Sequence, residues 1–221
     1  TSVFTAQRSG TKSLLAESGH GLDWCRAPTR NGPAIVPPPA PRTLPPTMTT
    51  QTVTLLFALL AVTAQVVVVA VVVAALTGRT RALRVRVGRY TLAAAAVVAL
   101  TATLGSLYLS EVADFPPCRL CWFQRSAMYP LVPLLGLAAV RRDQAIRLYG
   151  VVLAGLGAPV SIWHLFVERF PHLEGSSCDP LNPCSIIWVE RFGYLTIPAM
   201  ALSGFALVIA LLLLAPIPES P

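Results

Sequence analysis

The chain of 221 residues is 54% hydrophobic and only 12% charged, and it contains 20 prolines. A soluble domain carries about 25% charged residues, so this composition argues against a water-soluble enzyme core. The net charge of +7 need not indicate a nucleic-acid partner, because membrane proteins concentrate Arg and Lys on one side of the bilayer. We therefore expect a membrane protein that binds no nucleic acid.

Residues 1–50 differ in composition from the rest of the chain. They hold eight of the 20 prolines and show no helical or strand periodicity, so we expect a disordered extension and no packed domain. Met48 stands just before the first apolar run, which leaves two hypotheses open. Either translation begins at Met48, or residues 1–47 are a native tail that carries Cys25.

Five later stretches are almost free of charge, and each is long enough to cross a hydrocarbon core about 30 Å thick as a helix. The runs are continuous and rich in Ala, Leu and Val, which argues against the alternating pattern of a membrane β-barrel. We expect an all-α membrane protein with these spans: Val53–Leu76, Thr91–Ser110, Trp122–Val140, Leu148–Val167 and Leu195–Leu214.

Arginines predict the orientation of these spans. Residues 78–90 hold five arginines and no acidic residue, and Arg141, Arg142 and Arg147 fall in the connection two spans later. Short Arg-rich loops stay in the cytoplasm. The connections over about residues 111–121 and 168–193 must then face outward, and they hold six acidic residues against three arginines. We expect a multi-pass protein of the cell membrane with its C-terminal tail inside.

Four of the five cysteines fall in the two outward connections. Cys118 and Cys121 form a C-x-x-C pair at the start of the third span, and Cys178 and Cys184 enclose five residues of a Pro-rich loop. Three interpretations are open, because an outward compartment permits disulfides: two structural disulfides, a zinc site with four cysteine ligands, or a dithiol relay. Zinc ribbons usually pair two C-x-x-C knuckles, so we expect no metal.

The residues around Cys118 favour the relay. Pro116 and Pro117 predict an extended approach, so the helix should begin at or just after Cys118, with the C-x-x-C pair on its first turn. Unpaired N–H groups and the helix dipole stabilise a thiolate there and should lower its pKa. A purely structural disulfide would not need this position.

Arg125 follows Cys121 by four residues, so the two side chains share one helix face. Two interpretations of this charge in an apolar span are open. The guanidinium either reaches back to the membrane interface, or it is a fixed positive charge that polarises the carbonyl of a bound electron acceptor.

The motifs together resemble the disulfide bond formation protein B family (DsbB/BdbC). They are Pro-Cys-Arg-Leu-Cys-Trp-Phe-Gln-Arg at 117–125, the short Arg-rich loop, the later cysteine pair, and Phe-Gly-Tyr-Leu-Thr-Ile-Pro at 192–198. The short spacing of the second pair resembles the BdbC type. The resemblance covers about residues 91–214 and implies a four-helix transmembrane bundle with two outward redox loops. Residues 51–78 would add one extra N-terminal transmembrane helix.

Members of that family are membrane oxidoreductases that re-oxidise a DsbA-like thioredoxin-fold partner and pass the electrons to a quinone, either ubiquinone or menaquinone. By resemblance, Cys178 forms the mixed disulfide with the partner and Cys184 exchanges with Cys118. Cys121 is then the sulfur beside the quinone. Both cysteine pairs are expected on the extracytoplasmic face.

The resemblance also implies quinone-binding residues. Arg125 and Gln124 would polarise the quinone oxygen, and His164 resembles a family histidine near the quinone. Trp122 is close enough to Cys121 to line the pocket. Structural alternatives remain open for His164 and Trp122. A histidine near a helix end is often an interface residue with its hydrogen bonds satisfied, and Trp is enriched at membrane interfaces in any case.

Three rival functions predict other arrangements or behaviour of the cysteines. A vitamin K epoxide reductase-like protein has its loop pair before the C-x-x-C pair, and the order here is reversed. A thiol transporter of the DsbD/CcdA type has reactive cysteines within its spans, whereas all four here map to one face. A non-catalytic membrane scaffold with two structural disulfides predicts that Cys118→Ser alters stability without loss of electron transfer.

Overall fold

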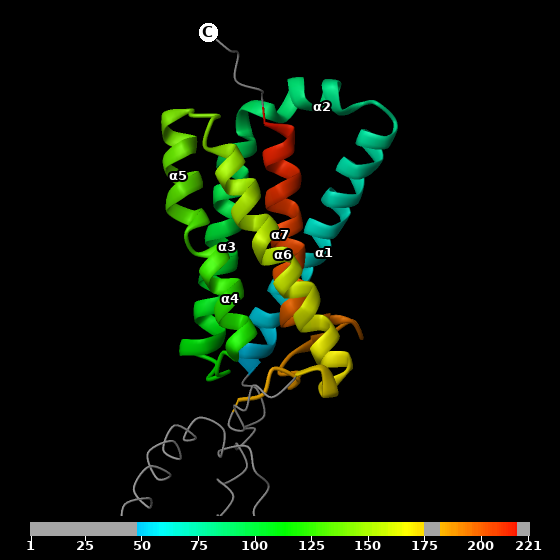
Figure 1. Cartoon of the computed structure of the whole chain (residues 1–221), viewed down its shortest axis with the longest axis vertical. Coiled ribbons are helices and arrows are strands. Elements are labelled where there is room, and N and C mark those ends of the chain that lie inside the picture. Colours follow the sequence, from blue (N-terminus) through cyan, green and yellow to red (C-terminus); the bar gives the residue numbers. More distant parts are fainter. Residues whose placement is uncertain (1–47, 175–181, 216–221) are drawn as a thin grey trace, which may run out of the picture. The chain divides into compact units, whose positions relative to one another are not determined.

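The computed structural model describes residues 48–174 and 182–215. The N-terminal extension, Cys25 and Cys178 lie outside these residues. The described part is mostly helical (Figure 1), with seven α-helices: α1 (Met48–Leu76), α2 (Thr80–Val87), α3 (Thr91–Glu111), α4 (Arg119–Met128), α5 (Leu131–Arg141), α6 (Arg147–Arg169) and α7 (Ile197–Leu214). Its minor elements are the 3-10 helices η2 (Gly88–Tyr90) and η3 (Pro171–Glu174) and the strands β1 (Glu190–Arg191) and β2 (Leu195–Thr196).

Four helical segments are long and apolar enough to cross a membrane. They are Thr49–Leu76, Thr80–Glu111, Arg147–Arg169 and Ile197–Leu214. They match four of the five expected spans, including the extra N-terminal one, although the last helix begins at Ile197 and not at the expected Leu195. The expectation of an all-α multi-pass membrane protein is therefore confirmed.

The expected third span, residues 122–140, consists of two shorter helices. α4 has 10 residues and α5 has 11, and the two follow each other from one end of the bundle to the other (Figure 1). The break falls at Tyr129 and Pro130, because the Pro130 ring excludes a backbone N–H and crowds the preceding turn. Pro130 thus separates two helices within the expected span.

The Arg-rich segment after α1 was expected to be a loop, but residues 80–87 form the helix α2. The reason is local, since Arg, Ala and Leu are good helix formers even where a loop would suffice. Arg84 Nη2 donates to the carbonyl of Leu213 at 3.0 Å, and Arg147 Nη1 donates to that of Ala215 at 3.2 Å. These arginines satisfy carbonyls at the C-terminal end of α7.

The buried core lies between α3, α5, α6 and α7. Phe205 on α7 is fully buried, and it fits because residue 157 on α6 is glycine. A Cβ atom at Gly157 would lie 2.3 Å from the Phe205 ring, so any larger residue would push the two helices apart. The other buried members of this cluster are Leu92, Ala95, Ala99, Ala127, Met128, Leu131, Leu135, Ala138, Ala154, Val208 and Leu212.

The Phe-Gly-Tyr-Leu-Thr-Ile-Pro motif builds a hairpin and the start of α7. β1 and β2 pair antiparallel, with Arg191 opposite Leu195. Phe192 and Gly193 turn the chain with φ angles of 55° and 74°, and the three residues 192–194 connect the paired Arg191 and Leu195. Thr196 then precedes α7, and its hydroxyl donates to the Glu168 carboxylate on α6 at 2.7 Å. The hairpin is thereby fixed to the end of α6.

Candidate functional site

Cys118 lies at the helix boundary that the prolines predict. It is the residue before α4, with extended backbone angles, and its carbonyl accepts the first helical hydrogen bond from Trp122 at 3.1 Å. Cys121 follows on the first turn. The predicted helix start at or just after Cys118 is therefore confirmed.

The thiol of Cys118 is held in its protonated form. Its Sγ donates to Sγ of Cys121 across 3.4 Å. This hydrogen bond, with burial added to it, raises the pKa of Cys118 to about 11. The expectation of a lowered pKa is therefore wrong for Cys118, whereas the same hydrogen bond lowers the pKa of Cys121, in the expected direction. The hydrogen bond to the neighbouring sulfur therefore outweighs the effect of the helix end on the pKa of Cys118.

Cys184 lies against the same pair. It is buried in a cluster with Cys118 and Val167, and its thiol donates to the sulfur of Cys118, which raises the pKa of Cys184. The three described cysteines thus form a row of free thiols in the order Cys184, Cys118, Cys121. Residues from two loops far apart in sequence meet here, as an exchange between Cys184 and Cys118 requires.

His164 on α6 contacts two members of this row, Cys184 and Cys118. Its Nε2 lies 3.1 Å from the carbonyl of Cys184 and 3.7 Å from Sγ of Cys118, and its Nδ1 lies 3.3 Å from the amide nitrogen of Gln124. The amide and the carbonyl are satisfied together only when Nε2 carries the proton and Nδ1 accepts. The ring therefore points an N–H at Cys184 and Cys118.

Glu174 fixes the other side of Cys184. Its carboxylate accepts a hydrogen bond from the backbone N–H of Cys184. Glu174 lies in η3, directly after α6, so this contact ties the loop that carries Cys184 to the end of the helix that carries His164. The backbone of Cys184 is held at both its N–H and its carbonyl.

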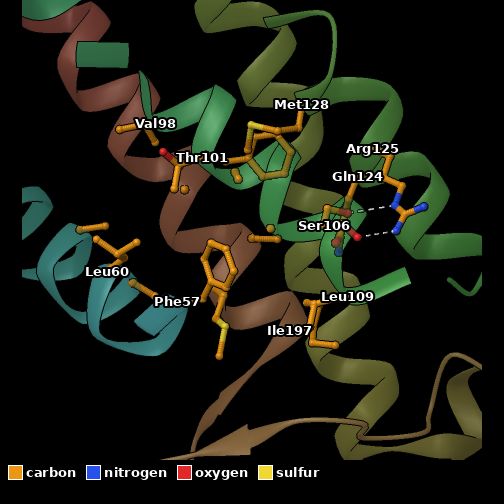
Figure 2. Close-up of a pocket in the computed structure, with 18 of the residues that line it drawn as sticks. Phe57, Leu60, Val98, Thr101, Ser106, Leu109, Gln124, Arg125, Met128 and Ile197 are labelled. Atoms are coloured by element: carbon orange, nitrogen blue, oxygen red, sulfur yellow. Dashed lines mark hydrogen bonds between the residues drawn. The ribbon is translucent and has the colours of Figure 1, made fainter. Parts of the chain in front are cut away.

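Arg125 turns into the bundle. It is only 8% exposed, and Ser106 on α3 binds it twice: Oγ accepts from Nε at 3.0 Å and the carbonyl accepts from Nη2 at 2.9 Å (Figure 2). No carboxylate of residues 48–174 or 182–215 forms an ion pair with it, and Nη1 has no hydrogen-bond partner within those residues. The charge is therefore fixed in place and keeps one donor nitrogen free.

A cavity of about 360 Å³ lies beside Arg125, within the size range of small-molecule sites. Its walls come from α1, α3, α4, α7 and the loop before α4, and Cys121, Gln124, Arg125 and Tyr129 line it together. In Figure 2, Arg125 and Ser106 lie on one side of the view and Phe57 and Leu60 of α1 on the other. A ligand here would touch the last sulfur of the row and the fixed charge.

The other candidate residues lie in different places. Gln124 lines the cavity and also binds His164, so it joins the two. His164 is not among the residues that line this cavity. It borders a smaller one of about 20 Å³, which Cys118, Cys121 and Cys184 also line. Trp122 does not line the large cavity either; it is 56% exposed, and its ring centre lies 5.3 Å from the Arg125 guanidinium carbon.

The thiols and the imidazole could also hold a metal ion. Sγ of Cys118, Sγ of Cys121 and a ring nitrogen of His164 all lie within 4.8 Å of one another. Such a site differs from the four-cysteine zinc site weighed above. It would compete with the hydrogen bond from His164 to Cys184, and the expected lack of a metal stays a prediction.

Two residues of this site were missed by sequence reasoning. Ser106 is one hydroxyl inside an apolar span, and Glu174 is one acid in an outward loop. Nothing in the spacing along the chain pairs Ser106 with Arg125 or Glu174 with Cys184, because both contacts join separate elements. A polar residue within a span was the only available signal for Ser106.

Comparison with known proteins gives consistent results. The family "Disulfide bond formation protein DsbB" matches residues 88–182. "Disulfide bond formation protein C" of Bacillus subtilis (strain 168) is 46% identical over 114 residues, which are 51% of this chain and 83% of that protein. A "Probable disulfide formation protein" of Oceanobacillus iheyensis is 41% identical over 120 residues, 53% of this chain and 83% of its own length. No solved structure matches the chain significantly.

Proposed function

Because the chain belongs to the DsbB family of disulfide bond formation proteins, we propose that it re-oxidises a DsbA-like thioredoxin-fold protein and passes the electrons to a membrane quinone. The observation that carries this proposal is the row of sulfurs. Cys184, Cys118 and Cys121 follow one another, and Cys121 lines the cavity beside Arg125. A path for electrons thus leads from an outward loop into the membrane.

The relay passes two electrons and two protons between the cysteine pairs. The partner dithiol attacks Cys178, the Cys178–Cys184 bond breaks, and the partner leaves as a disulfide while both cysteines become thiols. Cys184, as a thiolate, then attacks the sulfur of Cys118 in the oxidised Cys118–Cys121 pair, whose disulfide breaks, and Cys121 is released as a thiolate. Resolution by Cys178 restores its disulfide with Cys184 and leaves Cys118 and Cys121 as the reduced pair.

The residues of the cavity suit a quinone. Quinone oxygens only accept hydrogen bonds, and Arg125 and Gln124 bring donors to the end of the cavity where Cys121 lies. A bound quinone supplies the electron acceptor, which takes up two electrons and two protons as the Cys118–Cys121 disulfide re-forms. Arg125 stabilises the negative charge that develops on the acceptor oxygen, and Ser106 keeps the guanidinium in position for this.

The direction of electron flow follows from redox poise. DsbA has a potential of about −120 mV, which makes it a strong oxidant among dithiol proteins. Another protein thiol could hardly re-oxidise such a partner, whereas a quinone can. This requirement accounts for a relay that is embedded in a bilayer.

We assign the cysteines to the extracytoplasmic face and residues 91–214 to the redox bundle, with the first helix as an addition. The orientation is supported by the arginines of α2, which lie at the end of the bundle opposite the hairpin and the start of α4 (Figure 1). Arg-rich connections stay in the cytoplasm.

Trapping of the partner tests this function. A DsbA-like partner that keeps only its attacking cysteine should break the Cys178–Cys184 disulfide of the wild type and remain bound at Cys178 as a mixed disulfide, because its second thiol is missing. The Cys184→Ser variant has no such disulfide and should form no adduct. The wild type should release an intact partner oxidised, and beyond the two equivalents that its own two disulfides supply it should do so only when quinone is present. A scaffold with structural disulfides predicts neither the adduct nor the quinone requirement, and that result would overturn the proposal.

A further inference from the structure

α1 contributes to the cavity although it lies outside the part of the chain that the DsbB family matches. α1 ends at Leu76, and the match begins at residue 88. Six residues of α1 nevertheless line the cavity: Phe57, Leu60, Ala61, Thr63, Ala64 and Val67. Part of the cavity wall therefore comes from a helix that precedes the matched region.

α1 is attached to the bundle firmly enough to serve as a wall. Ala58 and Ala61 are buried against Leu195 and Ala199, and such small residues allow two helices to approach closely in a membrane. Gln65 adds polar contacts, because its amide nitrogen donates to the Ser203 hydroxyl at 3.0 Å and its oxygen accepts from Tyr194 at 3.0 Å. Near the outward end, Arg191 Nη2 donates to the Thr54 hydroxyl at 2.7 Å.

Phe57 is fitted to α3 at one position. Gly105 faces its ring, and a Cβ atom at residue 105 would lie 2.7 Å from two ring carbons. Because glycine leaves this space, the ring reaches α3 and borders the cavity between α1 and α3 (Figure 2). Leu60, one turn further along α1, borders the same space.

The cavity differs in character along its length. At one end, Cys121, Gln124 and Arg125 present sulfur, amide and guanidinium groups. Along α3 the lining runs from Leu109 to Val97, about 18 Å of helix. The part near α1 is mostly aliphatic and aromatic. Such a space fits a ligand with a polar ring and a long apolar chain.

We propose that α1 forms the binding wall for the isoprenoid chain of the quinone, with Phe57 and Leu60 as its principal contacts. This inference rests on the proposed function, since it assigns the ring of that quinone to the end with Arg125 and Cys121. Phe57 and Leu60 then determine affinity for tailed quinones and leave the thiol relay unchanged.

The expected effect is moderate for a physical reason. An isoprenoid chain that enters the cavity leaves lipid, which is as apolar as the cavity, so the hydrophobic effect contributes little. What Phe57→Ala or Leu60→Ala removes is close packing against the chain. We expect the KM for a tailed quinone to rise about three- to tenfold, with kcat almost unchanged.

The test compares two quinones with the same ring, one with an isoprenoid chain and one without. Full-length protein in detergent is assayed with a reduced DsbA-like partner for the wild type, Phe57→Ala, Leu60→Ala and Leu59→Ala. Leu59 is the matched control, because it is 51% exposed and is not among the residues that line the cavity. Partner oxidation in a single turnover and thermal stability show whether each variant is folded.

The proposal expects a higher KM for the tailed quinone alone, in Phe57→Ala and Leu60→Ala but not in Leu59→Ala. Equal KM values in all four proteins would overturn it, and so would equal rises for both quinones. Gly105→Ala, which displaces the Phe57 ring, should reproduce the effect of Phe57→Ala. If the wild type itself reduces neither quinone, the proposed function fails, which is a different result from failure of the α1 wall alone.

Discussion

Ser106 binds Arg125 at two of its three guanidinium nitrogens, with its hydroxyl at 3.0 Å and its carbonyl at 2.9 Å. The two residues come from α3 and α4, so the contact fixes a buried positive charge between two helices. The carbonyl cannot be removed by substitution, whereas the hydroxyl can. This asymmetry allows the position of the charge to be tested without removal of the charge itself.

Ser106→Ala should weaken use of quinone and spare exchange between the cysteines. The variant loses one hydrogen bond to a charged group, so we expect kcat/KM for quinone to fall about tenfold. Steady-state quinone reduction measures this effect. Ser126→Ala is the control, because Ser126 lies on the same helix as Arg125 and its exposed hydroxyl bonds the carbonyl of Trp122, on its own helix. An equal loss in both variants would contradict the positioning role.

His164→Leu should slow exchange between Cys184 and Cys118. The variant removes the N–H that lies 3.1 Å from the Cys184 carbonyl and 3.7 Å from Sγ of Cys118. We expect the rate of exchange to fall about tenfold, the effect of one lost buried hydrogen bond. Rapid quench and thiol alkylation measure this step directly. His172→Leu, in η3, should leave the rate unchanged, and a similar loss there would argue against a specific role for His164.

Glu174 should act through the backbone of Cys184. Glu174→Ala leaves the N–H of Cys184 without its acceptor, so the loop should hold Cys184 less firmly and exchange should slow about fivefold. Glu174→Gln keeps an acceptor oxygen and should recover most of the rate. If Gln is as slow as Ala, the carboxylate charge matters more than the hydrogen bond, and the positioning account is wrong.

The reactivity of reduced Cys118 should depend steeply on pH. Its pKa of about 11 keeps the thiol protonated below that pH, so the thiolate is roughly one part in a thousand at pH 8. Alkylation, which requires the thiolate, should speed up about tenfold for each pH unit from 8 to 10. Mass spectrometry follows the modified cysteine. Cys121→Ala removes the hydrogen bond that is the main cause of the raised pKa, so alkylation of Cys118 should speed up at lower pH in this variant. A plateau of the alkylation rate near pH 8 in the wild type would contradict the raised pKa.

Much of the fold was predictable because its causes are local. A charge-free run of about 20 residues is helical in a bilayer wherever its neighbours lie, so four spans match single helices. The start of α4 followed from Pro116 and Pro117, which exclude helix before Cys118. The spacing of Cys121 and Arg125 also predicted a shared face, and both residues line the same cavity.

The remaining features depend on contacts between elements. The ring of Phe57 meets Gly105, and Glu174 meets Cys184, through packing that no periodicity along the chain encodes. The raised pKa of Cys118 has the same origin, because it depends on where the neighbouring thiols lie. Local reasoning saw only the end of the helix and therefore predicted the opposite direction.

The central claim is that electrons from a partner dithiol reach a quinone through Cys184, Cys118 and Cys121. The most direct test follows quinone absorbance after the protein is mixed with reduced DsbA-like partner under anaerobic conditions. The account predicts one quinone reduced for each partner disulfide formed by the wild type, and none above background with Cys118→Ser or Cys184→Ser. Quinone reduction at the wild-type rate in either variant would contradict it, and so would partner oxidation beyond the protein's own two disulfides without quinone reduction.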